Sequence, residues 1–421
     1  MPGPLAGLNV VELATSIQGP AAGLYFANMG ARVVKVEPPV GDPSRYHRGV
    51  GNALPEDAPA PQFLAMNKAK RSVTLDLYTG LGRAVMAKLL ENADLFLSNF
   101  RASGLARMGL DLDELPERYP QLVVGHVNGF GPRGPDADKA MLDGAAQARG
   151  GLASMSGRPG EMPMPPGVAV ADHAGAMQLA LGCVTALLNR AATGRGQVVR
   201  TSSLGAQLWL QMWELQHAAL TGTRLTRAGT HHPNILGPYG VYRTSDGVEV
   251  LFVTALTEEA WAEFWIFFDK PEVILKEEWN SATKRLGFSG SEAGVAGIRR
   301  HLSEAFASKT FDAFAGFAAT QPELICERVR GHDDVLTDPQ NLANGYVVGL
   351  ELPSIGETPT IGTLMDFSAT PTVPPGQPPP LGAHTAEVMT ELGFAAADVD
   401  SVLGHCKREW QEAYAAMFGD D

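Results

Sequence analysis

Asp172 is the residue whose type and position best suit covalent chemistry. It lies in the stretch V-A-V-A-D-H-A-G, between a segment rich in proline and glycine (157–167) and a long apolar run. The run from Ala174 to Ala192, closed by Thr193-Gly194, predicts a helix. A carboxylate at a helix start accepts hydrogen bonds from free backbone N–H groups, and the helix dipole helps to keep it ionised. Such a residue is often only an N-cap, but it is also a potential nucleophile where a substrate reaches it.

The elements that would position Asp172 follow a strand–helix pattern. Short runs rich in β-branched residues alternate with helical stretches up to about Thr223. The expected strands are 8–13, 32–37, 72–77, 94–97, 122–127 and 197–201, with helices at 21–28 and 80–92. Such alternation predicts a Rossmann-like parallel sheet with helices on both faces.

The pattern changes after Thr223. A hairpin is predicted at 240–254 around Ser245-Asp246-Gly247, followed by helices at 258–268, 292–308 and 311–319. A proline-rich, strand-poor connection then leads from Asp338-Pro339 to Pro380, and helices at 386–392 and 397–418 follow. We therefore expect a large α/β domain built from 1–222 and 336–421, and a smaller α+β domain at 223–335.

Composition narrows the class of function. The chain has 421 residues and a formal net charge of -13, which argues against nucleic acid or an acidic membrane surface as a partner. Its three cysteines are far apart and form neither a disulfide framework nor a zinc motif, so we expect a cytoplasmic protein without a metal site. No stretch approaches the length of uninterrupted apolar residues that a membrane span needs.

Residues 8–37 imitate a dinucleotide-binding unit, with Glu37 at the end of the second predicted strand. The turn, however, reads T-S-I-Q-G-P rather than G-x-G-x-x-G, and Pro20 lacks an N–H where a pyrophosphate needs donors. A dinucleotide-dependent oxidoreductase is therefore a remote alternative.

Several separated motifs together resemble the family III CoA-transferases, which include formyl-CoA transferase and the carnitine CoA-transferases. In chain order they are L-A-G-L-N-V-V-E-L-A, G-P-A, G-A-R-V-V-K-V-E-P-P-V-G-D-P-S-R, N-K-A-K-R-S-V-T-L-D-L, S-N-F-R-A-S-G-L-A-R-M-G-L, D-G-A-A-Q-A-R-G-G, A-D-H-A-G, T-G-R-G-Q-V-V, D-P-Q and P-P-L-G-A-H-T. Each motif alone is weak, but the ordered set is specific and covers nearly the whole chain, least clearly from 223 to 330.

The resemblance implies a mechanism centred on Asp172. This residue matches the nucleophilic aspartate of the family, which attacks an acyl-CoA thioester and then carries an anhydride or a CoA thioester. Gly150-Gly151 would stabilise the oxyanion. The resemblance further implies an interlocked homodimer, acyl-CoA and a carboxylic acid as substrates, and no tightly bound cofactor.

CoA needs cations for its phosphates, and Lys70 with Arg71 lies beside a predicted strand at the sheet edge where such ligands bind. Positions that match or flank the CoA-binding positions of the family are Ile17, Gln18, Arg45, Asn99, Phe100, Arg101, Arg107, Met108 and Asp143. Formyl-CoA transferase has a glutamine two residues before its Gly-Pro, where this chain has Ile17 with Gln18 beside it. Its arginine after K-x-E is replaced by Pro38, and both departures argue against formate or oxalate specificity.

The α-methylacyl-CoA racemases of the same superfamily are the main alternative. They use a His-Asp pair on a loop, and here the corresponding residues are Leu142 and Asp143. Without the imidazole, a two-base proton exchange lacks one of its bases. The sequence therefore favours a transferase.

Overall fold

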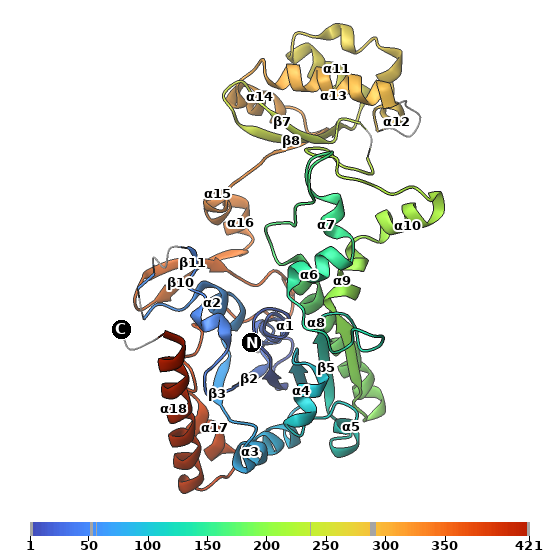
Figure 1. Cartoon of the computed structure of the whole chain (residues 1–421). Coiled ribbons are helices and arrows are strands. Elements are labelled where there is room, and N and C mark those ends of the chain that lie inside the picture. The colour runs from blue at the N-terminus through green and yellow to red at the C-terminus, as the bar shows by residue number, and fades with distance from the viewer. Residues whose placement is uncertain (1–2, 51–53, 56, 236, 287–291, 419–421) are drawn as a thin grey trace. The chain divides into compact units, whose positions relative to one another are not determined.

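A computed structural model describes residues 3–50, 54–55, 57–235, 237–286 and 292–418 (Figure 1). The chain divides into two compact units. Unit 1 contains 1–150, 167–210 and 336–421, and unit 2 contains 151–166 and 211–335. Unit 2 thus includes two segments, 151–166 and 211–222, that the sequence analysis had assigned to the large domain.

Unit 1 is built on a six-stranded parallel sheet in the order β3-β2-β1-β4-β5-β6, which confirms the expected α/β class. Its strands are β1 Asn9–Leu13, β2 Arg32–Glu37, β3 Arg71–Thr74, β4 Leu95–Ser98, β5 Val123–Asn128 and β6 Val198–Ser202. Its helices are α1 Gln18–Asn28, α2 Pro61–Asn67, α3 Gly80–Glu91, α4 Ala102–Arg107, α5 Leu115–Arg118, α6 Asp143–Arg149, α8 Val170–Thr193, α9 Ser203–Leu210, α16 Pro339–Ala343, α17 Thr385–Glu391 and α18 Ala396–Phe418. Helix α15 His332–Thr337 contains the point at which the chain passes from unit 2 to unit 1. Among the described residues, no helix combines the length and the apolar character that a membrane crossing requires.

Side chains alternate between the two faces of each strand, so the sheet packs against helices on both sides. On one face, Val10 and Val33 join α1 and α8 in a hydrophobic cluster. On the other face, Val11 and Val34 join α3, α4, α17 and α18. The C-terminal helices therefore cover the sheet begun by the N-terminal strands (Figure 1).

A hairpin interrupts the segment that the sequence analysis expected to be strand-poor. Strands β10 Val347–Leu352 and β11 Gly356–Ile361 pair antiparallel in a separate two-stranded sheet. Pro359 lies opposite Gly349, a position that tolerates proline because a two-stranded sheet has only edge strands. The expectation was wrong because the high proline content obscured the alternating burial of β10.

Unit 2 has an antiparallel sheet in the order β7-β8-β9. Strands β7 Gly240–Arg243 and β8 Glu249–Ala255 form the predicted hairpin, whereas β9 Leu324–Arg328 was not predicted. The helices of this unit are α7 Leu152–Met155, α10 Met212–Thr221, α11 Glu258–Phe267, α12 Ala282–Arg285, α13 Glu292–Phe306 and α14 Phe311–Ala318. Its core is aromatic, with Phe252, Trp261, Phe264, Trp265 and Phe306 all buried.

Charged side chains fill the space beneath α1 in unit 1. The Lys35 ammonium lies 3.0 Å from Glu12 Oε1 and 2.9 Å from Asp42 Oδ2, and all three side chains are fully buried. Lys70 donates to Glu12 Oε2 at 2.7 Å. Gly23 makes this possible, because a Cβ there would lie 1.8 Å from Glu12 Oε2. We call Glu12, Lys35, Asp42 and Lys70 the buried ion cluster.

Lys35→Met is expected to reduce the free energy of unfolding by about 3–5 kcal/mol, because it leaves two buried carboxylates without their shared cation. Urea denaturation at pH 7 measures the loss. Lys88→Met is the matched control, since Lys88 pairs with Glu91 on the surface of α3, and removing such a pair costs at most about 1 kcal/mol. Equal losses in the two variants would contradict the importance of the cluster.

Candidate active site

Asp172 lies in the first turn of α8, which begins at Val170 rather than near Ala174 as expected. The residue at the N-cap position is Ala169, which provides no side-chain cap. The backbone N–H of Asp172 instead donates to Asp143 Oδ1 at 3.0 Å. Asp143, at the start of α6, therefore performs the capping role that the sequence analysis gave to Asp172.

The carboxylate of Asp172 is held by side chains from two other elements. Ser203 Oγ, at the start of α9, donates to Asp172 Oδ1 at 3.0 Å. The side-chain amide of Gln18, at the start of α1, donates to Ser203 Oγ and also forms a hydrogen bond with Asp172. Both side chains are buried. We call Asp172, Ser203 and Gln18 the aspartate triad, and all three belong to unit 1.

The pKa of Asp172 is raised to about 6, chiefly by burial and to a smaller extent by the negative charge of Asp143. The hydrogen bonds from Ser203 and Gln18 act in the opposite direction, because they favour the ionised form. The sequence analysis considered only the helix start, which favours the ionised form, and did not anticipate the burial that raises the pKa of Asp172. At neutral pH the carboxylate is mostly charged but poorly solvated, and poor solvation favours attack on an electrophile.

The loop between β1 and α1 carries Ile17 and Gln18 towards the triad. Ser16 adopts a positive φ of 64°, and its N–H donates to the Asp42 carboxylate at 3.1 Å. Asn99 accepts from Thr15 N at 3.0 Å and donates to Thr15 O at 2.8 Å. Lys35 donates to Ala14 O at 2.8 Å, so the buried ion cluster also fixes this loop.

Lys70 and Arg45 were expected to bind CoA, but the structure places both in internal networks. Lys70 donates to Glu12, to Pro20 O at 2.7 Å and to Asn67 Oδ1 at 3.0 Å, so acceptors within the protein occupy its three N–H groups. Arg45 pairs with both oxygens of Glu37 and stacks on Phe63 with 3.7 Å to the ring centroid. This geometry argues for structural roles, which the sequence pattern did not reveal because it does not show which charges pair.

The remaining predicted CoA contacts follow β4. Phe100 and Met108 pack into the hydrophobic core of unit 1, whereas Arg101 and Arg107 are exposed. Neither arginine forms an ion pair with another described residue. Asn99 is occupied with Thr15, as noted above. Among the predicted cations, Arg101 and Arg107 are thus the ones that remain accessible.

Gly150 was expected to contribute to an oxyanion site. Its N–H instead donates to Ala146 O at 2.8 Å and so closes the last turn of α6. The amide of Gln207 packs against Gly150 and donates to Ala146 O. This geometry gives Gly150 a structural reason of its own, because any side chain at this position would overlap Gln207.

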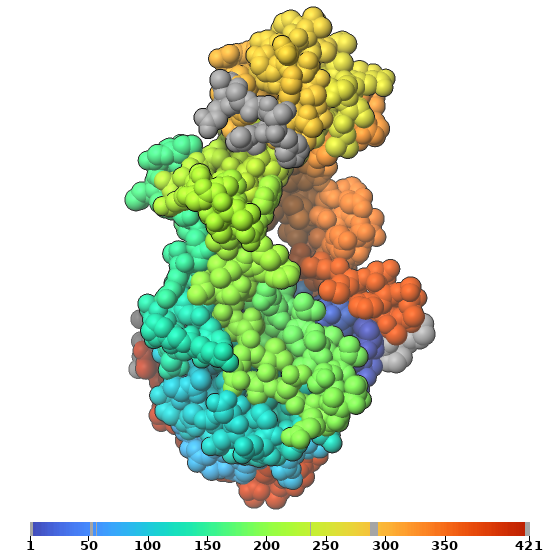
Figure 2. Space-filling model, turned by 90° about the vertical axis from the view of Figure 1, so that its right-hand side faces the viewer, coloured from blue at the N-terminus to red at the C-terminus, as the bar shows by residue number. Residues whose placement is uncertain are grey.

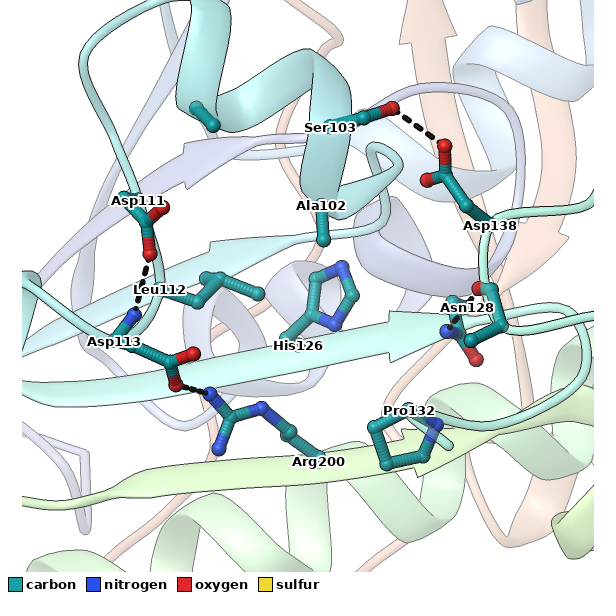
Figure 3. Close-up of a pocket in the computed structure, with 12 residues that line it drawn as sticks. Ala102, Ser103, Asp111, Leu112, Asp113, His126, Asn128, Pro132, Asp138 and Arg200 are labelled. Carbon is teal, nitrogen blue, oxygen red and sulfur yellow. Dashed lines mark hydrogen bonds and ion pairs between the residues drawn. The ribbon is translucent and has the colours of Figure 1, made fainter. Parts of the chain in front are cut away.

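A cavity of about 420 Å³ lies between α4 and the carboxyl ends of β5 and β6 (Figure 3). Arg200 pairs there with Asp113, and Ser103 donates to Asp138 at 2.6 Å. Asp111 adds a third carboxylate to the lining. With three carboxylates and one paired cation, this cavity is unsuited to a phosphate, and it contains no member of the aspartate triad. No three or more His, Cys, Asp or Glu side chains are grouped to hold a metal ion within the described ranges.

Ser203 is the site residue that the sequence analysis missed. It directly follows β6, at the carboxyl edge where open parallel sheets place functional residues. The sequence signal that could have identified Ser203 was its position just after the predicted strand 197–201. Its contact with Asp172, 31 residues away, was not visible in the pattern.

Asp172→Asn is expected to raise the unfolding temperature at pH 8, because it removes a poorly solvated charge. The folded-state pKa of about 6 exceeds the ordinary value of 3.8, so the destabilisation is complete above pH 6 and absent below 3.8. The difference in unfolding temperature between variant and wild type should therefore shrink from pH 8 to pH 4. Scanning calorimetry at both pH values measures it.

Asp312→Asn is the control, since Asp312 is an exposed residue in the first turn of α14. Removing its favourable interaction with the helix dipole should lower stability slightly or leave it unchanged. A pH-independent effect of Asp172→Asn would contradict the raised pKa.

Known proteins resemble this chain over almost its full length. The family model for CoA-transferase family III matches residues 5–385. The chain is 30% identical over 402 residues to a succinyl-CoA–D-citramalate CoA-transferase of Chloroflexus aurantiacus, covering 93% of this chain and 94% of that protein. It is 31% identical to a succinate–glutarate CoA-transferase of Agrobacterium fabrum, covering 92% and 96% respectively. A crystal structure of a CaiB/BaiF family protein from Brucella suis, 29% identical, matches with a TM-score of 0.81 over 93% of this chain and 100% of that one. The protein therefore belongs to CoA-transferase family III and is an enzyme of that family.

Proposed function

We propose that the protein moves CoA from an acyl-CoA donor to a carboxylic acid through covalent intermediates on Asp172. The observation that carries this proposal is the aspartate triad, in which a buried carboxylate with a pKa of about 6 is fixed by Ser203 and Gln18. Raised nucleophilicity together with a fixed orientation is what a carboxylate needs in order to attack a thioester.

The proposed reaction begins when a carboxylate oxygen of Asp172 bonds to the thioester carbon. The C–S bond breaks, so CoA leaves as a thiolate and a mixed anhydride remains. The thiolate then attacks the aspartyl carbon, which releases the donor acid and forms an aspartyl-CoA thioester. The acceptor carboxylate attacks the aspartyl carbon of that thioester, so the C–S bond breaks and a second mixed anhydride and free CoA thiolate form. The thiolate then attacks the acyl carbon of the acceptor, which gives the new acyl-CoA and frees the Asp172 carboxylate.

No proton is transferred in these steps, because every nucleophile and every leaving group is an anion. This fits a site in which Leu142 stands where the related racemases have a histidine. Leu142 is 82% exposed and offers no base. The transferase is therefore the better supported activity.

We further propose that Arg101 and Arg107 bind the phosphates of CoA. In this proposal Ile17, in the loop after β1, and Asn99 and Phe100, in the loop after β4, lie beside the bound CoA. Support comes from the exposure of both arginines, of which Arg101 lies just after the carboxyl end of β4, where open sheets bind ligands, and Arg107 ends the helix α4 that follows. CoA acts in this proposal as a substrate, not as a resident cofactor. The names of the relatives point to carboxylic acids as acceptors.

An interlocked homodimer is the proposed assembly. Met177, Leu181 and Leu188 on α8, with Trp209 and Leu210 on α9, expose large apolar side chains. The green and yellow-green surface of these helices faces the viewer in Figure 2. Monomers rarely expose a row of apolar side chains, so this face fits burial against a second copy.

Wild-type protein mixed with succinyl-CoA and a panel of carboxylic acids is expected to produce new acyl-CoA species, detected by mass spectrometry. Asp172→Ala should lower kcat by at least about 10³-fold, since it removes the group that forms both intermediates. Hydroxylamine should trap an acyl group on Asp172 in the wild type only. Retained turnover in the variant sinks the nucleophile assignment, and α-deuterium exchange without CoA transfer would indicate a racemase instead.

Light scattering is expected to give the mass of a dimer. Interlocked subunits separate only after unfolding, so tagged and untagged dimers should form hybrids only after denaturation and refolding. Leu181→Glu combined with Leu188→Glu should reduce the yield of dimer, because it buries charge at the contact. Leu275→Glu, at an exposed leucine of unit 2, is the control. A monomeric wild type, or free exchange of native subunits, would refute the proposed assembly.

A further inference from the structure

Ser203 has surroundings that restrict what its hydroxyl can do. It is fully buried at the start of α9, and Gly175 on α8 leaves room for it. A Cβ at Gly175 would lie 3.3 Å from Ser203 Oγ, so a larger residue there would crowd this oxygen. The hydroxyl contacts the amide of Gln18 on one side and Asp172 Oδ1 on the other.

The direction of both hydrogen bonds follows from which groups can donate and which can accept. An amide nitrogen only donates, so the Ser203 oxygen accepts from Gln18. The single hydroxyl proton of Ser203 is then directed to Asp172, whose ionised carboxylate only accepts. Gln18 thereby fixes the orientation of the serine proton, and Ser203 fixes Asp172 Oδ1.

We propose that Ser203 is a catalytic hydrogen-bond donor that holds Asp172 Oδ1 as the carbonyl oxygen of both covalent intermediates, while Oδ2 attacks the acyl group. The inference rests on the proposed function. It gives a reason for the hydroxyl donor on Oδ1, which the attack by Oδ2 does not by itself require. In the mixed anhydride, Oδ2 bridges the aspartyl and acyl carbons, and Oδ1 remains doubly bonded to the aspartyl carbon.

The second step is the one in which this donor matters most. When the CoA thiolate bonds to the aspartyl carbon, negative charge develops on Oδ1. The bond from the aspartyl carbon to Oδ2 then breaks, the donor acid leaves with Oδ2, and Oδ1 returns to a carbonyl. The Ser203 hydroxyl, supported by Gln18, stabilises the transient oxyanion as a pre-oriented donor. The same donor site acts again when the acceptor attacks the aspartyl-CoA thioester.

Removing a residue with this role slows the attacks on the aspartyl carbon more than the first attack of Asp172 on the acyl-CoA. Ser203→Ala is expected to lower kcat by about 10²-fold, the loss typical of one oxyanion donor, with KM for acyl-CoA nearly unchanged. In a single turnover without acceptor, quenched and examined by mass spectrometry, the acyl adduct on Asp172 should accumulate before the CoA adduct. Wild-type protein should convert the first adduct to the second without such accumulation.

The pH profile separates this role from a purely structural one. Removing a donor to the ionised carboxylate raises the pKa of Asp172, so the acidic limb of kcat/KM should move to higher pH. Gln18→Leu should move it in the same direction without altering Ser203, and it serves as the second variant should Ser203→Ala fold poorly. In the double variant the losses in kcat should add less than fully, because Gln18 acts partly through the Ser203 hydroxyl and partly through its own hydrogen bond with Asp172. Ser203→Thr keeps the hydroxyl and should recover part of kcat.

Ser202→Ala is the matched control. The Ser202 hydroxyl accepts from Gly205 N at 3.0 Å in the first turn of α9. Removing this hydroxyl should lower the stability of the protein without shifting the acidic limb of the kcat/KM profile. Wild-type kcat with an unshifted limb in Ser203→Ala would overturn the inference, and so would equal slowing of both steps. If the wild type itself transfers no CoA with any donor and acceptor, the proposed function fails, and that outcome is distinct from failure of the role of Ser203.

Discussion

The pairing of Lys35 with Glu12 and Asp42 is the interaction on which the site depends. Three fully buried charges tolerate the loss of water only because each has partners at hydrogen-bond distance. Burial opposes ionisation of Lys35, but its two carboxylate partners raise the pKa of the ammonium well above its usual range. Lys35 also donates to Ala14 O, and Asp42 accepts from Ser16 N. The buried ion cluster therefore also fixes the loop that precedes Gln18.

The same loop positions Gln18 beside the carboxylate of Asp172. Gln18 begins α1, Ser203 follows β6, and Asp172 lies at the start of α8, so three separate elements meet at one carboxylate. Burial and Asp143 favour the neutral form of Asp172, while Ser203 and Gln18 favour the charged form. Their balance leaves a carboxylate that is ionised at neutral pH but less solvated than one on the surface.

Much of the fold followed from periodicity. The six parallel strands were predicted within about two residues at their starts, because buried β-branched runs between helices have few other structures available. The start of α8 was placed near Ala174, after the proline- and glycine-rich segment 157–167, whereas Val170 and Ala171 already belong to the first turn of the helix. The hairpin β10–β11 was missed because proline usually argues against strands, an argument that does not hold at sheet edges.

The site was predicted less completely than the fold. Asp172 was predicted from its motif, and Lys70 was assigned to CoA because it lies beside a predicted strand at the sheet edge where such ligands bind, with Arg45 as a position that matches or flanks the family's CoA-binding positions. Pairing with Glu12 and Glu37 depends on which residues lie opposite each other across the sheet, and local sequence does not specify this. Ser203 was missed for the same reason, since its contact joins elements that are distant along the chain.

The aspartate triad and the capping residue Asp143 all belong to unit 1. The side chains that set the pKa and the orientation of Asp172 are therefore contributed by one unit, which has a core of its own distinct from the aromatic core of unit 2. Such a separation is a route to evolutionary change, because the reactive group can persist while a neighbouring unit accumulates variation. It also gives protein engineering a starting point, because substitutions can be chosen in unit 2 that leave every member of the triad and Asp143 unchanged in sequence.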